Sequence, residues 1–149
     1  MDTNTFDPAV RRYIYNTFLM QQRPPTIAES VDYFNVSADE MEAIYQRLAD
    51  AHIVVLQPGK TEIQFANLFS AVPTRFKVNA KGHSWWGTCA WDALGILAAL
   101  RADGEVVSSC PDCDEPIVLK VENGSVVGNQ EVMHFSVPAH KWWDDIFFT

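Results

Sequence analysis

The 149-residue sequence lacks several features that would place it in a broad class of proteins. Its three cysteines are odd in number and too few for a disulfide framework, which predicts a reducing compartment. No apolar run approaches the roughly 18 residues that cross a bilayer, and residues 1–7 lack the pattern of a secretory signal. Basic residues are also scarce, and the net charge of −8 disfavours binding to nucleic acid or anionic membranes. We therefore expect a cytoplasmic protein without nucleic-acid or membrane partners, and its oligomeric state stays open.

Metal-binding motifs are equally sparse in the sequence. The four histidines are scattered, and no two of them have the spacing of a ligand pair. Cys110 and Cys113 form a single Cys-x-x-Cys, which supplies only two of the four ligands of a structural zinc site. We expect no resident cofactor, and we interpret the two thiols as soft-metal ligands, with a labile redox pair or a chance turn as the alternatives.

The first 66 residues predict a small helical module. Apolar residues make up 48% of the chain and charged residues 20%, which indicates a packed core. Pro8 at a first helical position, Thr26 as a cap, and Ser37 with Glu40 as a capping box mark the starts of three helices. Two apolar runs around a Pro-Gly turn then predict a hairpin. The expected elements are helices over about 8–20, over 27–34 and from 38, and strands over 53–56 and 61–65.

Three helices followed by a hairpin form a winged-helix pattern, which is often associated with DNA binding. Residues 1–66 carry 5 basic and 9 acidic side chains, a net charge of −4. The helix that would enter the groove begins with Asp39-Glu40-Met41-Glu42, which would place carboxylates against phosphates. We therefore expect this module to pack against the second half of the chain rather than to bind DNA.

The second half, residues 67–149, predicts a mostly antiparallel β core around one buried helix. Asn123-Gly124 is a strong hairpin signal, and residues 132–137 alternate in the manner of a strand. Residues 145–148 are expected to form a last strand. The predicted fold class is therefore α+β, with a winged-helix-like three-helix module over 1–66 and a core over 67–149. The strands expected in the core are 76–78, one that includes 85–86, 105–109, 116–121, 125–127, 132–137 and 145–148.

Cys89 and Asp92 form the pair with the most chemical information. The apolar, proline-free run Ala93–Leu100 predicts a buried helix, with Thr88 as its N-cap and Gly104 near its end. Cys89 then lies at the first helical position, and Asp92 follows one turn later on the same face. A thiol at a helix N-terminus is biased toward the thiolate. The pair predicts a soft nucleophile or metal ligand beside a proton carrier, and the alternatives are a small buried Cys and a carboxylate that complements the helix dipole.

Three segments of the second half resemble the alkylmercury (organomercurial) lyase family. The resemblance extends from about residue 8 to the end of the chain, and its most specific part is the Cys-Ala-x-Asp sequence with its aromatic flank. Family enzymes continue beyond the position of Thr149, so the chain resembles a short and divergent member. The matching segments are Phe69–Thr74, Trp86–Leu94, and Val107–Pro111 with its continuation to Ile117.

The resemblance implies an enzyme that cleaves carbon–mercury bonds. In this family one thiolate captures the organic mercury compound, a second cysteine completes the attack, and a carboxyl group protonates the departing carbon. By this match Cys89 is the first thiolate and Asp92 is the proton donor. The substrate is a small organomercurial, and mercury(II) departs as the product ion to other thiols. Soft thiolates suit a soft metal, and the cleavage requires a proton at the carbon.

The late part of the sequence departs from the family at one position. Phe147-Phe148 matches a family strand, but Trp142 stands where the second catalytic cysteine is expected. An indole cannot replace a thiolate as a metal ligand. Cys113, with Cys110, would supply a replacement if their turn folds back over Cys89, which would give a site with three thiols.

The tryptophans suggest a second interpretation of the same site. We expect an aromatic substrate pocket formed by Trp86, Trp91, Trp142 and Trp143. Two alternatives to the mercury reaction stay open: an enzyme of the same fold that acts on another small organic substrate, and a non-enzymatic module that binds soft metals or thiols. A second thiol near Cys89 favours the lyase, whereas Trp142 in that space favours the repurposed enzyme.

Overall fold

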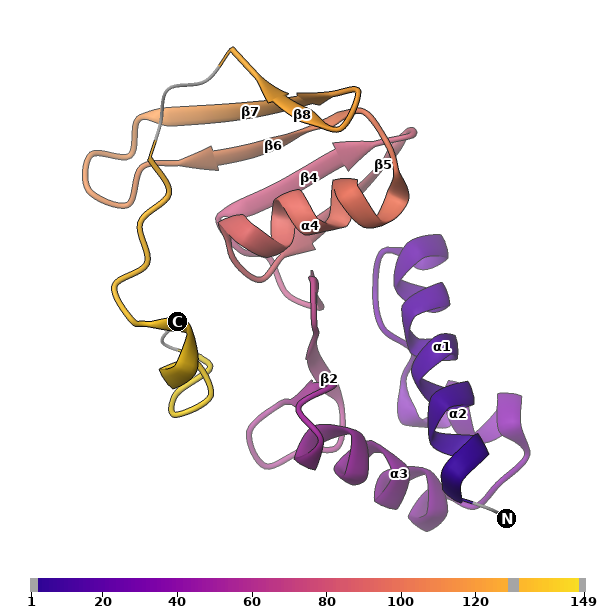
Figure 1. Ribbon diagram of the computed structural model, residues 1–149. Coiled ribbons are helices and arrows are strands. Elements are labelled where there is room, and N and C mark those ends of the chain that lie inside the picture. The colour runs from indigo at the N-terminus through magenta and orange to yellow at the C-terminus, as the bar shows by residue number, and fades with distance from the viewer. Residues whose placement is uncertain (1–2, 129–131, 148–149) are drawn as a thin grey trace.

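The computed structural model describes residues 3–128 and 132–147 as a mixed α+β fold with one continuous sheet (Figure 1). No helix in these two ranges is long and apolar enough to cross a membrane. The helices are α1 (Thr3–Gln21), α2 (Ile27–Phe34), α3 (Ala38–Asp50), α4 (Ala90–Leu100) and the 3-10 turn η1 (Ala139–Lys141). The strands are β1 (Val55–Leu56), β2 (Ile63–Ala66), β3 (Phe69–Ser70), β4 (Phe76–Ala80), β5 (His83–Gly87), β6 (Gly104–Ser109), β7 (Pro116–Glu122) and β8 (Ser125–Val127).

Helix α1 starts earlier than the sequence suggests. Pro8 lies inside the helix, in its second turn, so the prediction that it occupies the first helical position is wrong. As the sixth residue of the helix, Pro8 removes one intrahelical hydrogen bond, because it has no N–H to donate to the carbonyl four residues before it. Val10, Ile14 and Phe18 are almost fully buried and follow helical spacing. They form the face with which α1 enters the core.

The predicted capping residues of α2 and α3 are confirmed. The Thr26 hydroxyl accepts a hydrogen bond from the backbone N–H of Glu29, and the Glu29 carboxylate accepts one from the backbone N–H of Thr26. Ser37 caps α3 by accepting the N–H of Glu40 at 3.2 Å, which is one half of the capping box predicted there; the complete box is the one at Thr26 and Glu29. Each contact satisfies backbone donors that would otherwise lack a partner at a helix start. The buried face of α3 includes Tyr45, whose hydroxyl lies 2.8 Å from that of Ser30 on α2.

All eight strands belong to one antiparallel sheet, in the order β1-β2-β3-β5-β4-β6-β7-β8. The hairpin predicted at Asn123-Gly124 joins β7 to β8, and both residues adopt positive φ. Strands β2 and β3, on either side of residue 67, pair with each other. The sheet therefore runs across the predicted division at residues 66 and 67, and that division stays a prediction.

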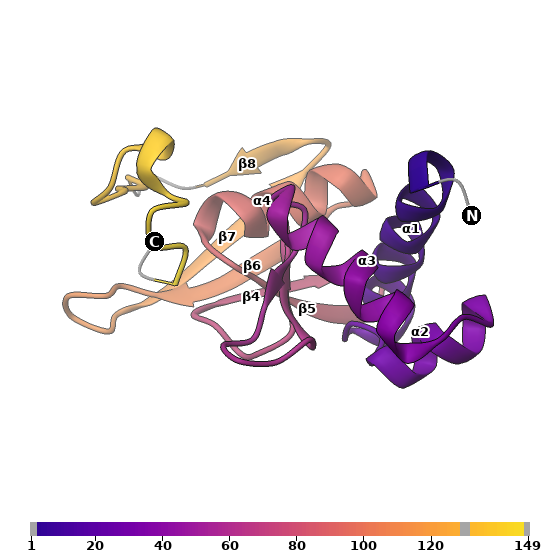
Figure 2. The same ribbon diagram turned by 90° about the horizontal axis from the view of Figure 1, so that it is seen from below.

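Helix α4 covers one face of the sheet beside β4 and β5 (Figures 1 and 2). Its buried residues are Ala93, Ile96 and Leu97. The helix ends at Leu100 because Arg101 adopts a left-handed conformation. Gly104 is not the stop signal that the sequence suggested, since it already belongs to β6. A Cβ at this glycine would lie 2.5 Å from the carbonyl oxygen of Asn79, so the close approach of β4 requires glycine.

The N-terminal helices and the sheet share one hydrophobic core. The indole N–H of Trp85 on β5 donates to the backbone oxygen of Phe18 on α1 at 2.9 Å. The ring of Phe18 also stacks on Phe69 of β3, with centroids 5.3 Å apart. These contacts hold α1 against the central strands and fix one side of the site described below.

The C-terminal segment contains neither of the two strands that its alternating sequence predicts. Residues 132–137 are irregular and residues 145–147 form turns, while residue 148 lies outside the described part. In Figure 1 the described C-terminal residues, drawn in yellow, lie beside the hairpin that contains β2. The aromatic side chains of the segment pack elsewhere: Trp143 stacks on His52 at 4.0 Å, and Phe147 contacts Phe65 at 5.8 Å between centroids. Within the segment, the ring of Phe135 packs against Trp142, with centroids 5.2 Å apart.

Candidate active site

Cys89 is the N-cap of α4, one residue after the position that the sequence assigned to the cap. Its sulfur accepts the backbone N–H of Asp92 at 3.5 Å. Thr88, the predicted cap, is held instead by the turn before β3, because its N–H donates to the Leu68 carbonyl at 3.3 Å. The Thr88 hydroxyl donates to the carboxylate of Asp92 and lies 3.5 Å from the carbonyl oxygen of Asn67. The cysteine and the carboxyl thus meet at one helix end.

Gly87 allows the start of α4 to approach the sheet this closely. A Cβ at Gly87 would lie 2.8 Å from the Cα of Ala93, a distance that real contacts essentially never show. The carbonyl of Gly87 also accepts the hydroxyl of Thr74 at 2.6 Å. The first turn of α4 is therefore seated directly on the end of β5, which fixes the positions of Cys89 and Asp92.

Burial raises the pKa of Asp92 above its ordinary value. Hydrogen bonds from Thr88 and Cys89 oppose this shift because they stabilise the carboxylate, but they do not cancel it. Asp92 therefore retains its proton to a higher pH than an exposed aspartate. This is the property that a proton donor requires near neutral pH.

Burial also raises the pKa of the Cys89 thiol, and the negative charge and hydrogen bond of Asp92 act in the same direction. The N–H groups of Asp92 and Trp91 at the helix start lower it, but they are outweighed. The expectation of a thiolate favoured by the helix N-terminus is therefore wrong in direction. A hydrogen bond between the two residues runs from the backbone N–H of Asp92 to the Cys89 sulfur at 3.5 Å, which keeps the thiol beside the carboxyl.

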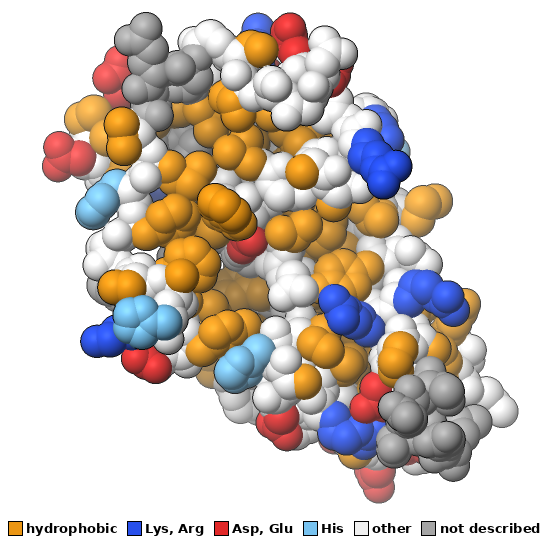
Figure 3. Space-filling model, in the orientation of Figure 1, with side chains coloured by type: hydrophobic (Ala, Val, Ile, Leu, Met, Phe, Trp, Pro, Cys, Tyr) orange, Lys and Arg blue, Asp and Glu red, His pale blue; other side chains and the backbone are white. Residues whose placement is uncertain are grey.

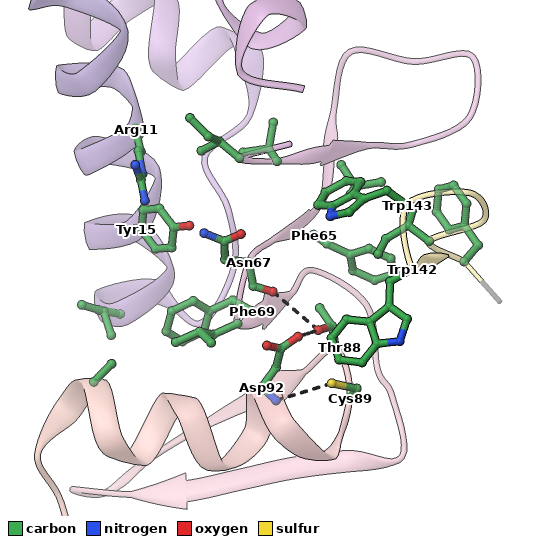
Figure 4. A pocket seen from close by; sticks show the side chains of 18 of the residues that line it. Arg11, Tyr15, Phe65, Asn67, Phe69, Thr88, Cys89, Asp92, Trp142 and Trp143 are labelled. Atoms are coloured by element: carbon green, nitrogen blue, oxygen red, sulfur yellow. Dashed lines mark hydrogen bonds between the residues drawn. The ribbon is translucent and has the colours of Figure 1, made fainter. Parts of the chain in front are cut away.

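The pair opens into a cavity of about 970 Å³ that four parts of the chain enclose (Figure 4). Figure 3 shows a hollow bordered mainly by hydrophobic side chains, with Lys and Arg gathered toward α1. Such a cavity accommodates a small organic molecule. Its lining comes from α1, from the β1–β3 region, from α4 with the residues before it, and from the C-terminal segment; the polar members are Arg11, Arg12, Tyr15, Asn67, Thr88, Cys89 and Asp92.

Two of the four tryptophans assigned to the pocket line it. Trp142 and Trp143 contribute to the wall on the side of the C-terminal segment, and Trp142 stands over Cys89 in Figure 4. The Trp142 indole N–H donates to the carbonyl of Val137 at 2.8 Å. Trp91 lies outside the lining and is 65% exposed. Trp86 is also outside it, with the Lys77 ammonium 5.9 Å from its ring.

Cys110 and Cys113 do not join Cys89. They lie in the turn between β6 and β7, and neither lines the cavity. Cys113 is exposed and Cys110 is half-buried. Hydrogen bonds from the backbone and the side chain of Cys113, and from the backbone of Asp112, lower the pKa of Cys110. In the described part of the chain, no three His, Cys, Asp or Glu side chains are grouped to hold a metal ion, so the predicted three-thiol arrangement is not formed.

Sequence reasoning missed the polar wall of the cavity, which consists of Arg11 and Tyr15 on α1 and Asn67 between β2 and β3 (Figure 4). Arg11 and Tyr15 are four residues apart, so they share a helix face, and the guanidinium lies 5.7 Å from the tyrosine ring centroid. That spacing was available in the sequence. No local signal indicated that this face would meet the start of α4.

Comparisons with known proteins agree with this architecture. No curated protein sequence matches the chain. A solved structure, the crystal structure of the mercury-bound form of MerB2, is similar with a TM-score of 0.63 and 22% sequence identity. The similarity covers 82% of this chain and 58% of that one, and at this identity it shows the fold. The sequence profile of the alkylmercury lyase family matches residues 69–148, which is more than half of the chain. The chain therefore belongs to the alkylmercury lyase family.

Proposed function

We propose that the protein cleaves carbon–mercury bonds of small organomercurials by protonolysis. One observation carries this proposal: Cys89, whose sulfur accepts the backbone N–H of Asp92 at 3.5 Å, and the carboxyl of Asp92 both line one cavity of about 970 Å³. A soft sulfur ligand and a carboxyl that can take up a proton and pass it to carbon are the two groups that the reaction requires. Family membership supports the same assignment.

The proposed reaction begins with proton transfer inside the pair. The Cys89 thiol passes its proton to the Asp92 carboxylate as sulfur binds mercury and displaces the ligand opposite the organic group. Asp92 then delivers a proton to the carbon as the carbon–mercury bond breaks, with the bonding electrons remaining on carbon. The hydrocarbon leaves, and mercury(II) stays on the sulfur of Cys89. A thiol from solution binds the ion and removes it, since neither Cys110 nor Cys113 lines the cavity.

The surroundings of the pair suit this proton transfer. Phe69 and Leu68 contribute apolar wall next to Asp92 and Thr88. Apolar walls exclude water, so the proton goes to the substrate carbon rather than to solvent. The Thr88 hydroxyl holds the carboxyl of Asp92 in one orientation.

Trp142 favours a second candidate function. Its ring lines the cavity above Cys89, in the part of the chain where the family resemblance calls for a second thiol. An aromatic surface at this place supports binding of a flat organic substrate. In this alternative the same fold uses Cys89 and Asp92 on a small organic substrate without mercury.

We assign the remaining thiols to a separate role. Cys110 and Cys113 form a two-thiol site for a soft metal ion on the β6–β7 turn, supported by the lowered pKa of Cys110. In this role the two thiols bind a metal ion and take no part in catalysis. We also propose that residues 1–66 are a winged-helix-like module that serves as a wall of the cavity, and that the protein acts in the reducing cytoplasm on small molecules.

Turnover of phenylmercury in excess small-molecule thiol tests the proposal. The expected result is benzene release by the parent protein, loss of release in Cys89→Ser, and strong slowing in Asp92→Asn. Cys110→Ser with Cys113→Ser provides a matched control that keeps activity. No release by the parent protein contradicts the mercury reaction, and release that survives Cys89→Ser contradicts the site.

A further inference from the structure

The polar wall (Arg11, Tyr15 and Asn67) faces the cavity across from Cys89 and has no role in the proposed cleavage. The Tyr15 hydroxyl is buried from solvent and makes no well-formed hydrogen bond among the described residues; burial raises its pKa, while the nearby Arg11 and Asn67 side chains lower it. Figure 4 shows it directed toward the Asn67 side chain within the cavity. A buried hydroxyl without a partner costs free energy. A ligand atom that accepts its proton removes this cost.

The charge of the cavity is opposite to that of the protein. The charged side chains in its lining are Arg11, Arg12 and Asp92, whereas the whole chain has a net charge of −8. Among residues 3–128 and 132–147, neither arginine forms an ion pair with a carboxylate. The Asp92 carboxyl accepts a hydrogen bond from the Thr88 hydroxyl. Its pKa is shifted by burial, Thr88 and Cys89, and by neither arginine. The lining therefore offers unpaired positive charge on the α1 side.

We propose that the polar wall binds a carboxylate on the organic group of the substrate. This inference rests on the proposed function and deepens it by naming the substrate class: small organic acids whose opposite end carries the reacting carbon. Arg11 supplies a planar fork of N–H donors that matches a carboxylate, the Tyr15 hydroxyl donates one further hydrogen bond, and the Asn67 amide donates another. Each of these donors is available inside the lining of one cavity.

The distribution of polarity along the cavity fits such a molecule. The lining also contains many apolar side chains, and one of them, Phe69, lies between Tyr15 and Asp92 in Figure 4. A hydrocarbon or aromatic body fits there with its acid group toward α1 and its reacting carbon toward α4 (Figure 4). The acid group fixes the orientation, which places the reacting end beside the proton donor.

Mercury-free ligands test this proposal independently of the cleavage reaction. Calorimetric titration compares benzoate with benzamide, which has the same shape without the charge. We expect the parent protein to bind benzoate about tenfold more tightly, because hydrogen bonds to a charged group are stronger than neutral ones. Arg11→Gln abolishes this preference, and Tyr15→Phe, which keeps the ring, reduces it severalfold. Lys77→Gln, on a cation that lies beside Trp86 and outside the cavity, leaves it unchanged.

Equal affinities for the two ligands overturn the proposal, and so does failure to bind either of them. A preference that survives Arg11→Gln overturns it as well, provided that circular dichroism shows both variants to be folded. The cleavage assay is a separate arm: benzoate preference without release of hydrocarbon contradicts the mercury reaction alone. Where cleavage occurs, 4-carboxyphenylmercury has a lower KM than phenylmercury, and Tyr15→Phe narrows that difference.

Discussion

The two cysteine-containing regions of the molecule place the same side chain in opposite environments. Cys89 caps α4 at the wall of a cavity, where burial raises the pKa of its thiol. Cys110 lies in the β6–β7 turn, where hydrogen bonds from Cys113 and Asp112 lower the pKa of its thiol. The more acidic thiol is therefore the one outside the cavity. Ease of ionisation alone does not single out Cys89, the cysteine that we propose to be reactive.

The difference lies in what each thiol has beside it. Cys89 lies beside Asp92, whose backbone N–H donates to its sulfur and whose carboxyl has a pKa raised by burial. Cys110 has a second thiol, Cys113, nearby. The groups that favour its thiolate are Cys113 and the backbone of Asp112, and none of them is a buried carboxyl. The first arrangement suits attack coupled to proton transfer, and the second suits binding of a soft ion.

Removing the sulfur at Cys89 should produce the largest effect. Cys89→Ser keeps a side chain that can cap α4 but loses the soft ligand, so cleavage of phenylmercury should fall by roughly 1,000-fold or more. Benzene release measured by gas chromatography checks this. The double variant Cys110→Ser and Cys113→Ser should retain most of the activity; an equal loss there would erase the contrast between the two regions.

Removing the proton at Asp92 should come next. Asp92→Asn keeps the shape and an acceptor for the Thr88 hydroxyl, but it cannot deliver a proton, so cleavage should slow by about 100-fold. The measurement is single-turnover hydrocarbon release, with mercury retention on the protein followed in parallel. Full-speed release by the variant would assign the proton donor to another group.

Displacing the start of α4 should have a moderate effect on stability. In Gly87→Ala the added methyl meets the backbone of Ala93, which cannot yield without moving the helix, so the free energy of unfolding should fall by about 2 kcal/mol. Gly95→Ala is the matched control, because its methyl meets the end of the flexible Leu68 side chain. Urea denaturation of both variants gives the comparison. Equal losses of unfolding free energy would show that the close contact at Gly87 matters no more than the one at Gly95.

The smallest effect should be the order in which the thiols react. A raised pKa leaves less thiolate at a given pH, so Cys89 should need a higher pH than an ordinary thiol for alkylation by iodoacetamide, and Cys110 a lower one. At pH 7.5 Cys110 should react at least about threefold faster. Mass spectrometry of digested protein over a pH series measures both midpoints. In Asp92→Asn the midpoint of Cys89 should move down, because a negative neighbour is gone; an unchanged midpoint would deny the coupling.

Local sequence signals predicted the parts of the fold that depend on neighbours in the chain. Thr26 and Ser37 cap helices as expected, and Asn123-Gly124 turns a hairpin. Cys89 and Asp92 share the start of a helix, as the apolar run after them indicated. Capping and turn geometry are set within a few residues, so the sequence is sufficient for them.

The missed features depend on contacts between distant parts of the chain. Residues 132–137 alternate like a strand but are irregular, and the ring of Phe135 packs against Trp142 of the same segment. The direction of the Cys89 pKa shift depends on burial that α1 and the C-terminal segment create around the cavity. The polar wall with Arg11 likewise exists only because α1 is held to β5 through Trp85.

The walls of the cavity come from two stretches of the sequence. Cys89 and Asp92 lie inside the segment that the family profile matches, residues 69–148, whereas the polar wall comes from residues before it. Under the two proposals, bond cleavage and choice of substrate are carried by separable stretches of the chain. Substitutions on α1 are then expected to change which organic group binds while the proposed reacting atoms at α4 stay in place.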